Sequence, residues 1–179
     1  MITFVAFLRA INVGGRVVKM ERLREVFSSL GFERVETFIA SGNVIFAAKS
    51  GSAAQLEKKI EAALERELGY AVRTFLRTEA EVVALASCQP FRKGGEGRLF
   101  IGFLEKPPTR EAQEKLLAAE TEIDEFEIVE RELYWRIRGN SSNSKFFGPL
   151  LEKTLGVAAT IRNANTVRRL AEKFQPSAK

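Results

Sequence analysis

The chain has 179 residues, 45% of them hydrophobic, and a net charge of +5, which is the composition of an ordinary globular protein with one large domain or two small ones. It has no histidine, one aspartate (Asp124) and one cysteine (Cys88), so imidazole catalysis, nearly all zinc sites, two-aspartate magnesium sites and internal disulfides are excluded. No apolar run approaches the ~20 residues of a membrane span and no basic segment precedes the apolar N-terminus, so we expect a cytoplasmic protein without a signal peptide or a cofactor.

The first half of the chain predicts six elements in the order β-α-β-β-α-β. Both alternating sets of the first segment are apolar, which is typical of a strand covered on both faces. A helical period of apolar residues marks the first helix, and a capping box at Ser52 and Gln55 opens the second. The predicted elements cover residues 2–9, 20–30, 35–40, 44–47, 52–68 and 70–76.

The second half repeats this order after a linker. A capping box at Thr78 and Glu81 opens a short connecting helix, and residues 89–97, rich in glycine, are the most linker-like stretch. The strands and helices predicted beyond it cover residues 99–104, 109–120, 125–130, 133–138, 146–155 and 157–161, before a final helix. We predict an α+β fold of two tandem ferredoxin-like β-α-β-β-α-β units with antiparallel sheets in the strand order 4-1-3-2, plus a C-terminal helix. The first unit with its connecting helix is expected at 1–88, and the second with the C-terminal helix at 98–179.

Aromatic residues and the cysteine are expected in the core. The pairs Tyr134-Trp135 and Phe146-Phe147 lie within predicted elements. One RNA-binding module of this fold class stacks bases on sheet aromatics, but its aromatic motif is absent from this sequence. Cys88 is expected to be a small buried hydrophobic residue.

Charged residues are unevenly distributed. Basic residues gather near both ends of the chain, and acidic residues gather in 110–130. In each predicted unit, polar loops meet at one edge of the sheet and offer amides, hydroxyls and cations together, as an anion site does. The candidate ligand-binding residues on these loops are Arg9, Asn12, Gly14, Gly15, Lys19, Ser41, Gly42, Asn43, Ser144, Lys145, Arg162, Asn163, Asn165 and Thr166.

Several candidates also have an ordinary structural explanation. The glycines at 14–15 fit a flexible connection, because they match neither a P-loop nor a dinucleotide-binding fingerprint. The turn at 41–43 has hairpin chemistry, Asn163 and Asn165 are good helix N-caps, and Ser144-Lys145 fits the start of a helix. Arg9, at the end of an apolar strand, fits an ion pair with a glutamate.

Short motifs near both ends of the chain carry a family resemblance. They are FLRAINVGG at 7–15, MERLR at 20–24, IASGNVIF at 39–46, Ser144-Lys145, Leu155-Gly156 and TIRNANTV at 160–167. These motifs resemble those of domain-of-unknown-function family 1697, over nearly the whole chain, and the signature residues are the candidates above apart from Lys19. The resemblance implies a duplicated ferredoxin-like fold in a bacterial cytoplasmic protein, and it implies no activity. Ala164 stands where the family usually has a tryptophan.

Three functions fit these features. The first is binding of a phosphate-bearing or other anionic ligand, such as a nucleotide or nucleic acid, at the basic loops. The second is an enzyme acting on a small anionic metabolite without histidine, through Lys19, Lys145, Ser41 or a glutamate. The third is a structural or interaction module with no ligand. No membrane partner is expected, and the sequence predicts no oligomeric state.

Overall fold

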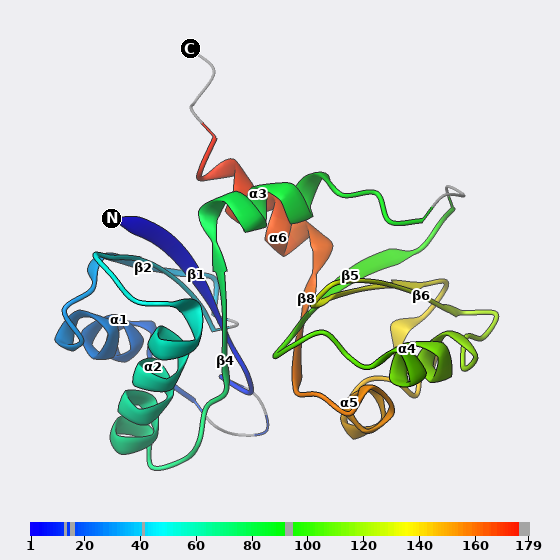
Figure 1. The fold of residues 1–179 in the computed structure, drawn as a ribbon, viewed down its shortest axis with the longest axis horizontal. Helices are drawn as coiled ribbons and strands as arrows, with labels where there is room; N and C mark the ends of the chain where they lie inside the picture. The colour runs from blue at the N-terminus through cyan, green and yellow to red at the C-terminus, as the bar shows by residue number, and fades with distance from the viewer. Residues whose placement is uncertain (13, 15–16, 41, 92–94, 176–179) are drawn as a thin grey trace. The chain divides into compact units, whose positions relative to one another are not determined.

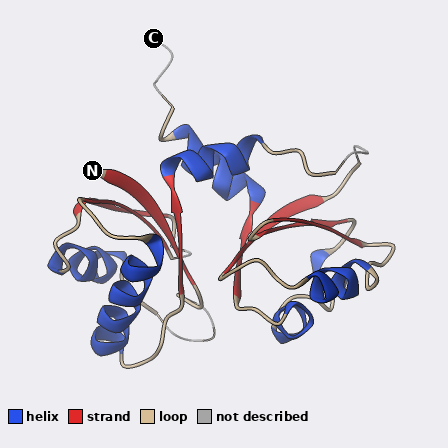
Figure 2. Cartoon of the chain, in the orientation of Figure 1, coloured by secondary structure: helices blue, strands red, loops and turns tan. Residues whose placement is uncertain are grey.

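The computed structural model describes residues 1–12, 14, 17–40, 42–91 and 95–175 (Figure 1). Two four-stranded antiparallel sheets form in this part of the chain. Helices cover one face of each sheet, as Figure 2 shows by colour. Among the helices described, none has both the length and the apolar character that crossing a membrane requires.

The first sheet has its first strand in the interior. Its strands lie in the order β2-β3-β1-β4, because β1 pairs with β3 on one side and with β4 on the other. The central position explains why both faces of β1 are apolar. The elements are β1 (Ile2–Leu8), α1 (Met20–Ser29), β2 (Glu33–Phe38), β3 (Asn43–Ala48), α2 (Ala53–Leu68) and β4 (Thr74–Thr78).

The second sheet has the same arrangement, in the order β6-β7-β5-β8. Helix α3 (Glu79–Ser87) precedes it and α6 (Ala164–Glu172) follows it. The predicted ferredoxin-like α+β fold and the strand order 4-1-3-2 are confirmed in both halves. The remaining elements are β5 (Arg98–Leu104), α4 (Arg110–Leu117), β6 (Asp124–Val129), β7 (Glu132–Ile137), a 3₁₀ turn (Ser141–Asn143), α5 (Pro149–Leu155) and β8 (Ala159–Asn163).

The chain divides into two compact units. Unit 1 contains Met1–Leu85 and the segment from Leu170 on, and unit 2 contains Ala86–Arg169. Both divisions fall inside helices, in α3 and in α6. The folding domains expected at 1–88 and 98–179 stay a prediction, because a division by contacts does not test independent folding.

Aromatic rings fill the core between each sheet and its helices. In unit 1, the Phe46 ring lies 4.4 Å from Phe32 and 5.3 Å from Phe27, measured between centroids. In unit 2, the fully buried Trp135 lies 5.8 Å from Phe126. Such clusters combine a large buried apolar area with favourable ring geometry.

The face of each sheet turned away from these helices is buried as well. Its aromatic side chains alternate along the strands with the core residues. Four of them are at most 2% exposed and are therefore not available for stacking on nucleic-acid bases, namely Phe7 and Phe75 in unit 1 and Phe103 and Tyr134 in unit 2. Phe38 of β2, which shares this face through its pairing with Asn43, is half-buried.

Helix α5 begins later than the sequence pattern predicts. It starts at Pro149 rather than at residue 146, because proline lacks the amide hydrogen and suits the first helical position. Gly148 precedes it with φ +98°. Phe146 is buried as expected, but Phe147, expected in the core, is 42% exposed and covers the Trp135 ring from one side.

Three of the four edge strands receive hydrogen bonds from glutamates. Strands β4, β6 and β8 each lie at the edge of a sheet. The carboxylates accept from outward amides at 2.7–2.8 Å, through the pairs Glu61 with Thr74, Glu57 with Leu76, Glu120 with Phe126 and Glu152 with Ala159. Strand β2 instead has a register irregularity between Glu33 and Glu36. Both devices block pairing with another strand.

Candidate functional site

Two polar loops of unit 1 meet at the edge where β1 ends. The backbone amide of Leu8 donates to the carbonyl of Gly42 at 2.8 Å, and that of Arg9 donates to Arg73 at 2.9 Å. We call the described residues 9–12, 14, 17–19, 39, 40 and 42 the unit 1 rim. The predicted meeting of the two loops is therefore present in the structure.

The side chain of Asn12 ties the two loops together. Its Nδ2 donates to the carbonyl of Ala40 at 2.9 Å, and its Oδ1 accepts from the amide of Val18 at 2.6 Å. Asn12 has φ +56°, a conformation that asparagine tolerates better than most residues. Its amide thus has a structural role at the rim.

Asn43 and Gly42 also support the rim from within. Asn43 is fully buried, and its Nδ2 donates to the carbonyl of Phe38 at 3.1 Å. A Cβ at Gly42 would lie 2.9 Å from the Cβ of Ile11, so the turn packs closely on the loop after β1. Gly15 and Ser41, two further candidates, lie outside the described residues.

Left-handed backbone conformations concentrate in these two loops. Gly14 and Gly42 have φ values of +62° and +74°. Three residues other than glycine also have positive φ values, namely Ala10 at +58°, Asn12 at +56° and Ile39 at +51°. Conformations of this kind persist only where the surrounding structure imposes them, and they cluster at functional sites.

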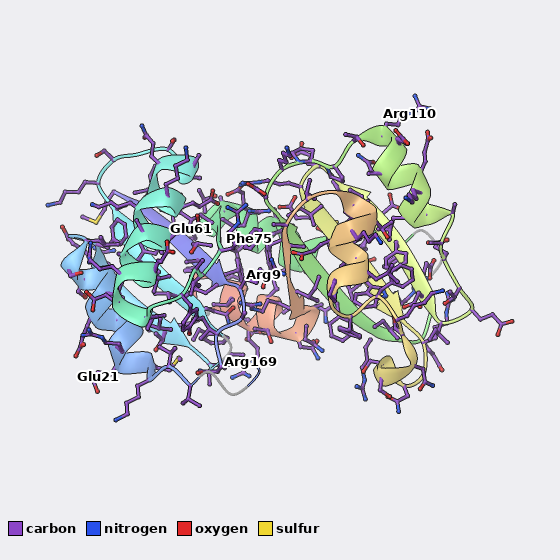
Figure 3. All side chains as sticks on the ribbon, turned by 90° about the horizontal axis from the view of Figure 1, so that it is seen from below. Arg9, Glu21, Glu61, Phe75, Arg110 and Arg169 are labelled. Carbon is purple, nitrogen blue, oxygen red and sulfur yellow. The ribbon has the colours of Figure 1, made fainter. Side chains whose placement is uncertain are left out.

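The cations of the rim are accessible. Lys19 is exposed and its side chain makes no capping hydrogen bond to α1. Arg9, labelled in Figure 3, is half-buried at the end of β1. The Arg73 side chain, whose residue pairs with Arg9 through the backbone, is 44% exposed and lies 3.9 Å from the Glu61 carboxylate. The rim therefore has two cations of its own, Arg9 and Lys19, and a third beside it.

The second set of candidates lies where β5 begins. Ile137 at the end of β7 is opposite Arg98, and Asn163 at the end of β8 is opposite Phe100. The loop after β7 and the start of α6 therefore share one edge, as predicted. The unit 1 rim lies where the central strand β1 ends, whereas this second set lies where the central strand β5 begins. The two sets of candidates therefore do not occupy corresponding positions in the two units.

Most polar groups of this second set make local hydrogen bonds. Ser144 is buried and its Oγ accepts from the amide of Phe146 at 3.2 Å. The Oδ1 of Asn163 accepts from the amide of Asn165 at 2.9 Å, which confirms its capping role at the start of α6. The Oδ1 of Asn165 accepts from the guanidinium of Arg168 at 2.7 Å. Lys145 is exposed and Thr166 is half-buried.

Arg162 is buried, and a second arginine has the corresponding place in unit 1. Arg162 donates to Thr160 Oγ1 and to the carbonyl of Ile161, both at 2.9 Å. Desolvation lowers the pKa of its guanidinium to about 10, so the group is still charged at neutral pH. Arg77, opposite Val5 in β1, likewise donates to the carbonyl of the residue before it, at 2.8 Å. Both side chains are anchored parts of the sheets.

A cavity in unit 2 was not anticipated from the sequence. It has a volume of about 470 Å³ and is lined by Pro90, Phe91, Leu117, Glu120, Glu125, Phe126 and Glu127. The Arg136 guanidinium lies 4.4 Å from the Phe91 ring and 2.8 Å from the Glu125 carboxylate through its Nε. The residues that line the cavity come from separate elements, so no local sequence motif predicts it. Its glutamates make it unsuited to an anion.

Metal binding finds no support in the described residues, where no three cysteine, aspartate or glutamate side chains are grouped to hold an ion. The two sheets with their helices define an α+β protein of two ferredoxin-like units. The chain belongs to the family described as "Protein of unknown function (DUF1697)", whose model matches residues 1–134. The motif at 160–167 lies beyond the matched part.

Comparison with solved structures supports the same fold. The chain is similar to a conserved bacterial protein from Streptococcus pneumoniae, with a TM-score of 0.76 and 24% sequence identity. The similarity covers 97% of this chain and 99% of the other. A comparison with curated proteins finds no match.

Proposed function

We propose that the unit 1 rim binds a phosphate-bearing or other anionic ligand, such as a nucleotide or a nucleic acid. The observation that carries this proposal is a pair of cross-tied loops with accessible cations and no carboxylate. Residues 9–19 and 39–43 contain arginines, a lysine and no acidic residue. The two loops themselves therefore carry positive and no negative charge, and the nearest carboxylate given is that of Glu61, paired with Arg73.

The hydrogen bonds of the rim favour binding over a purely flexible connection. Asn12 and Asn43 hold Val18, Ala40 and Phe38 through hydrogen bonds of 2.6–3.1 Å. Residues that are already held in this way lose little conformational freedom when a ligand binds. The cations gathered on the rim do not form the acid–base pair that an enzyme would need, so we propose binding rather than catalysis there.

Lys19 offers the cleanest test, since its side chain has no capping role in α1. Binding of nucleoside monophosphates and of a labelled single-stranded oligonucleotide is measured by NMR and fluorescence anisotropy at several salt concentrations. We expect Lys19→Ala to weaken binding and to lower the salt slope for the oligonucleotide by about 1. Lys58→Ala, which removes an exposed lysine from α2, is the matched control. Equal losses in the two variants, or no binding by the unchanged protein, would refute the proposal.

We also infer that the two units arose by internal duplication. The matching strand orders support this inference. So do the buried arginines Arg77 and Arg162, which pair with corresponding residues of the central strands. The ligand contacts predicted for Ser144, Lys145 and the residues near the start of α6 stay a prediction.

A further inference from the structure

Ile39 has a backbone conformation that its side-chain type rarely adopts. Its φ is +51°, whereas a β-branched side chain makes the left-handed region unfavourable. The residue is 41% exposed, so burial in the core does not explain why an isoleucine occupies this position. Asparagine or glycine would suit the backbone better. An exposed isoleucine in this conformation is therefore a candidate contact for a ligand.

A second exposed apolar side chain lies on the same rim. Val17 is 87% exposed. Asn12 accepts from the amide of Val18 and donates to the carbonyl of Ala40. One side chain thus holds the direct neighbours of both Val17 and Ile39. The rim presents two apolar side chains to solvent beside its cations.

We propose that the ligand of the unit 1 rim is a nucleoside monophosphate. Its base lies against Ile39 and Val17, and its phosphate is held by the rim cations Lys19 and Arg9. This inference rests on the proposed function and narrows it. A bare phosphate gives an exposed isoleucine nothing to contact. The face of a base, in contrast, removes apolar surface from water on both partners.

The experiment compares probes that share the phosphate and differ in the base. The four nucleoside 5′-monophosphates and ribose 5-phosphate are titrated into the labelled protein, and the amide signals of the rim are followed by NMR. We expect at least one nucleotide to bind about tenfold more tightly than ribose 5-phosphate. Ile39→Asn should reduce this ratio to about one and leave the affinity for ribose 5-phosphate unchanged.

Stability supplies the second readout. Asparagine is tolerated at positive φ, so Ile39→Asn should keep the melting temperature or raise it by up to about 4 °C. A clear fall in melting temperature would assign Ile39 to the fold and overturn the inference. Val129→Asn, which replaces an exposed apolar residue of β6 in unit 2, is the control and should leave every affinity unchanged.

The outcomes separate this inference from the proposed function. If ribose 5-phosphate and the nucleotides bind the rim equally well, the inference fails and anion binding stands. If no phosphate probe shifts the rim amides, both fail. Binding to vesicles of anionic phospholipid that depends on Ile39, without any preference for a nucleotide over ribose 5-phosphate, would also overturn the nucleotide assignment.

Discussion

Gly14 and Gly42 lie on the same rim with similar backbone conformations, but in different surroundings. Their φ values are +62° and +74°. A Cβ at Gly14 would meet nothing within 4 Å, whereas one at Gly42 would lie 2.9 Å from the Cβ of Ile11 and 3.3 Å from that of Leu8. Gly14 therefore needs only conformational freedom, and Gly42 also needs the space.

Alanine substitutions should separate these two requirements. We expect Gly14→Ala to lower the free energy of unfolding by about 1–2 kcal/mol, the strain of a left-handed residue. Gly42→Ala adds overpacking against Ile11, so the loss should reach about 2–5 kcal/mol. Urea unfolding of both variants measures the difference. Equal losses would show that the loop after β1 moves aside and that the packing around Gly42 is loose.

Tyr134 is buried on the second face of the unit 2 sheet. Burial raises the pKa of its hydroxyl well above the ordinary value, and a hydrogen bond with Cys88 raises this pKa further. Cys88 is half-exposed rather than fully buried, which corrects the expectation from the sequence. The pair thus keeps a neutral phenol inside the unit at alkaline pH.

This raised pKa predicts a loss of stability at high pH. Below about pH 10, the ordinary pKa of tyrosine, the side chain is neutral in both the folded and the unfolded chain. Above it, the unfolded chain binds fewer protons than the folded one, so the free energy of unfolding falls as the pH rises. The phenolate absorbance of Tyr134 should appear only when the protein unfolds. Tyr134→Phe should leave the absorbance titration of the folded protein unchanged, and a smaller folded-state signal in this variant would contradict the prediction.

At the residue scale, the sequence predicts positions better than roles. Strand order alone places Asn12 and the turn at 41–43 on one edge, and the structure confirms it. That the amide of Asn12 would hold Val18 and Ala40 depends on positive φ values and side-chain rotamers. A local sequence pattern predicts neither the φ values nor the rotamers. The strain at Ile39 is hidden from the sequence for the same reason.

Glutamates on the helices complete the hydrogen bonding of the edge strands. Glu61 of α2, labelled in Figure 3 together with Phe75 of β4, accepts from the amide of Thr74 at 2.8 Å. Thr74 is buried, so this amide would otherwise lack a partner from water. The carboxylate therefore both stabilises unit 1 and occupies a group that a foreign strand would need.

Removal of the Glu61 carboxylate should affect only the edge of the unit 1 sheet formed by β4. We expect Glu61→Ala to lower the free energy of unfolding by about 1–3 kcal/mol, because a buried donor loses a charged acceptor. The amide of Thr74 should exchange faster with solvent than in the unchanged protein. Glu65→Ala, on the exposed side of the same helix, is the control and should change neither quantity. Unaltered exchange at Thr74 in Glu61→Ala would show that the strand edge is protected by other means.

At the element scale, local signals predict most beginnings of helices. The capping boxes at Ser52 and at Thr78 are both formed, because each needs only residues three positions apart. Strand limits are less accurate. Strand β4 begins at Thr74 rather than at residue 70, since its pairing with β1 begins opposite Leu8. The start of such a strand is determined by its pairing within the sheet and not by the sequence of the segment itself.

The two units share chain segments in a way that the sequence does not reveal. Lys173, which follows α6, forms an ion pair with Glu36 and lies 5.6 Å from the Phe38 ring, both on β2 of unit 1. Phe91, beyond α3, contacts Arg136 of unit 2. A repeat read along the chain assigns each last helix to the unit before it. The division by contacts places most of each helix there, but the last residues of α3 and of α6 in the other unit.

Because α3 and α6 each cross from one unit to the other, neither unit can unfold completely without unwinding a helix that the other uses. We therefore predict one cooperative unfolding transition. Ile60→Val removes a buried methylene from the unit 1 core and should lower stability by about 0.5–1.5 kcal/mol. Trp135, the single tryptophan, lies in unit 2, yet its fluorescence midpoint should fall by about 2–4 °C, together with the unit 1 amides followed by NMR. Ile2→Val, the same change at a half-exposed residue, should leave both midpoints in place. If Ile60→Val left the midpoint of the Trp135 fluorescence transition unchanged, this result would show that the shared helices do not couple the units.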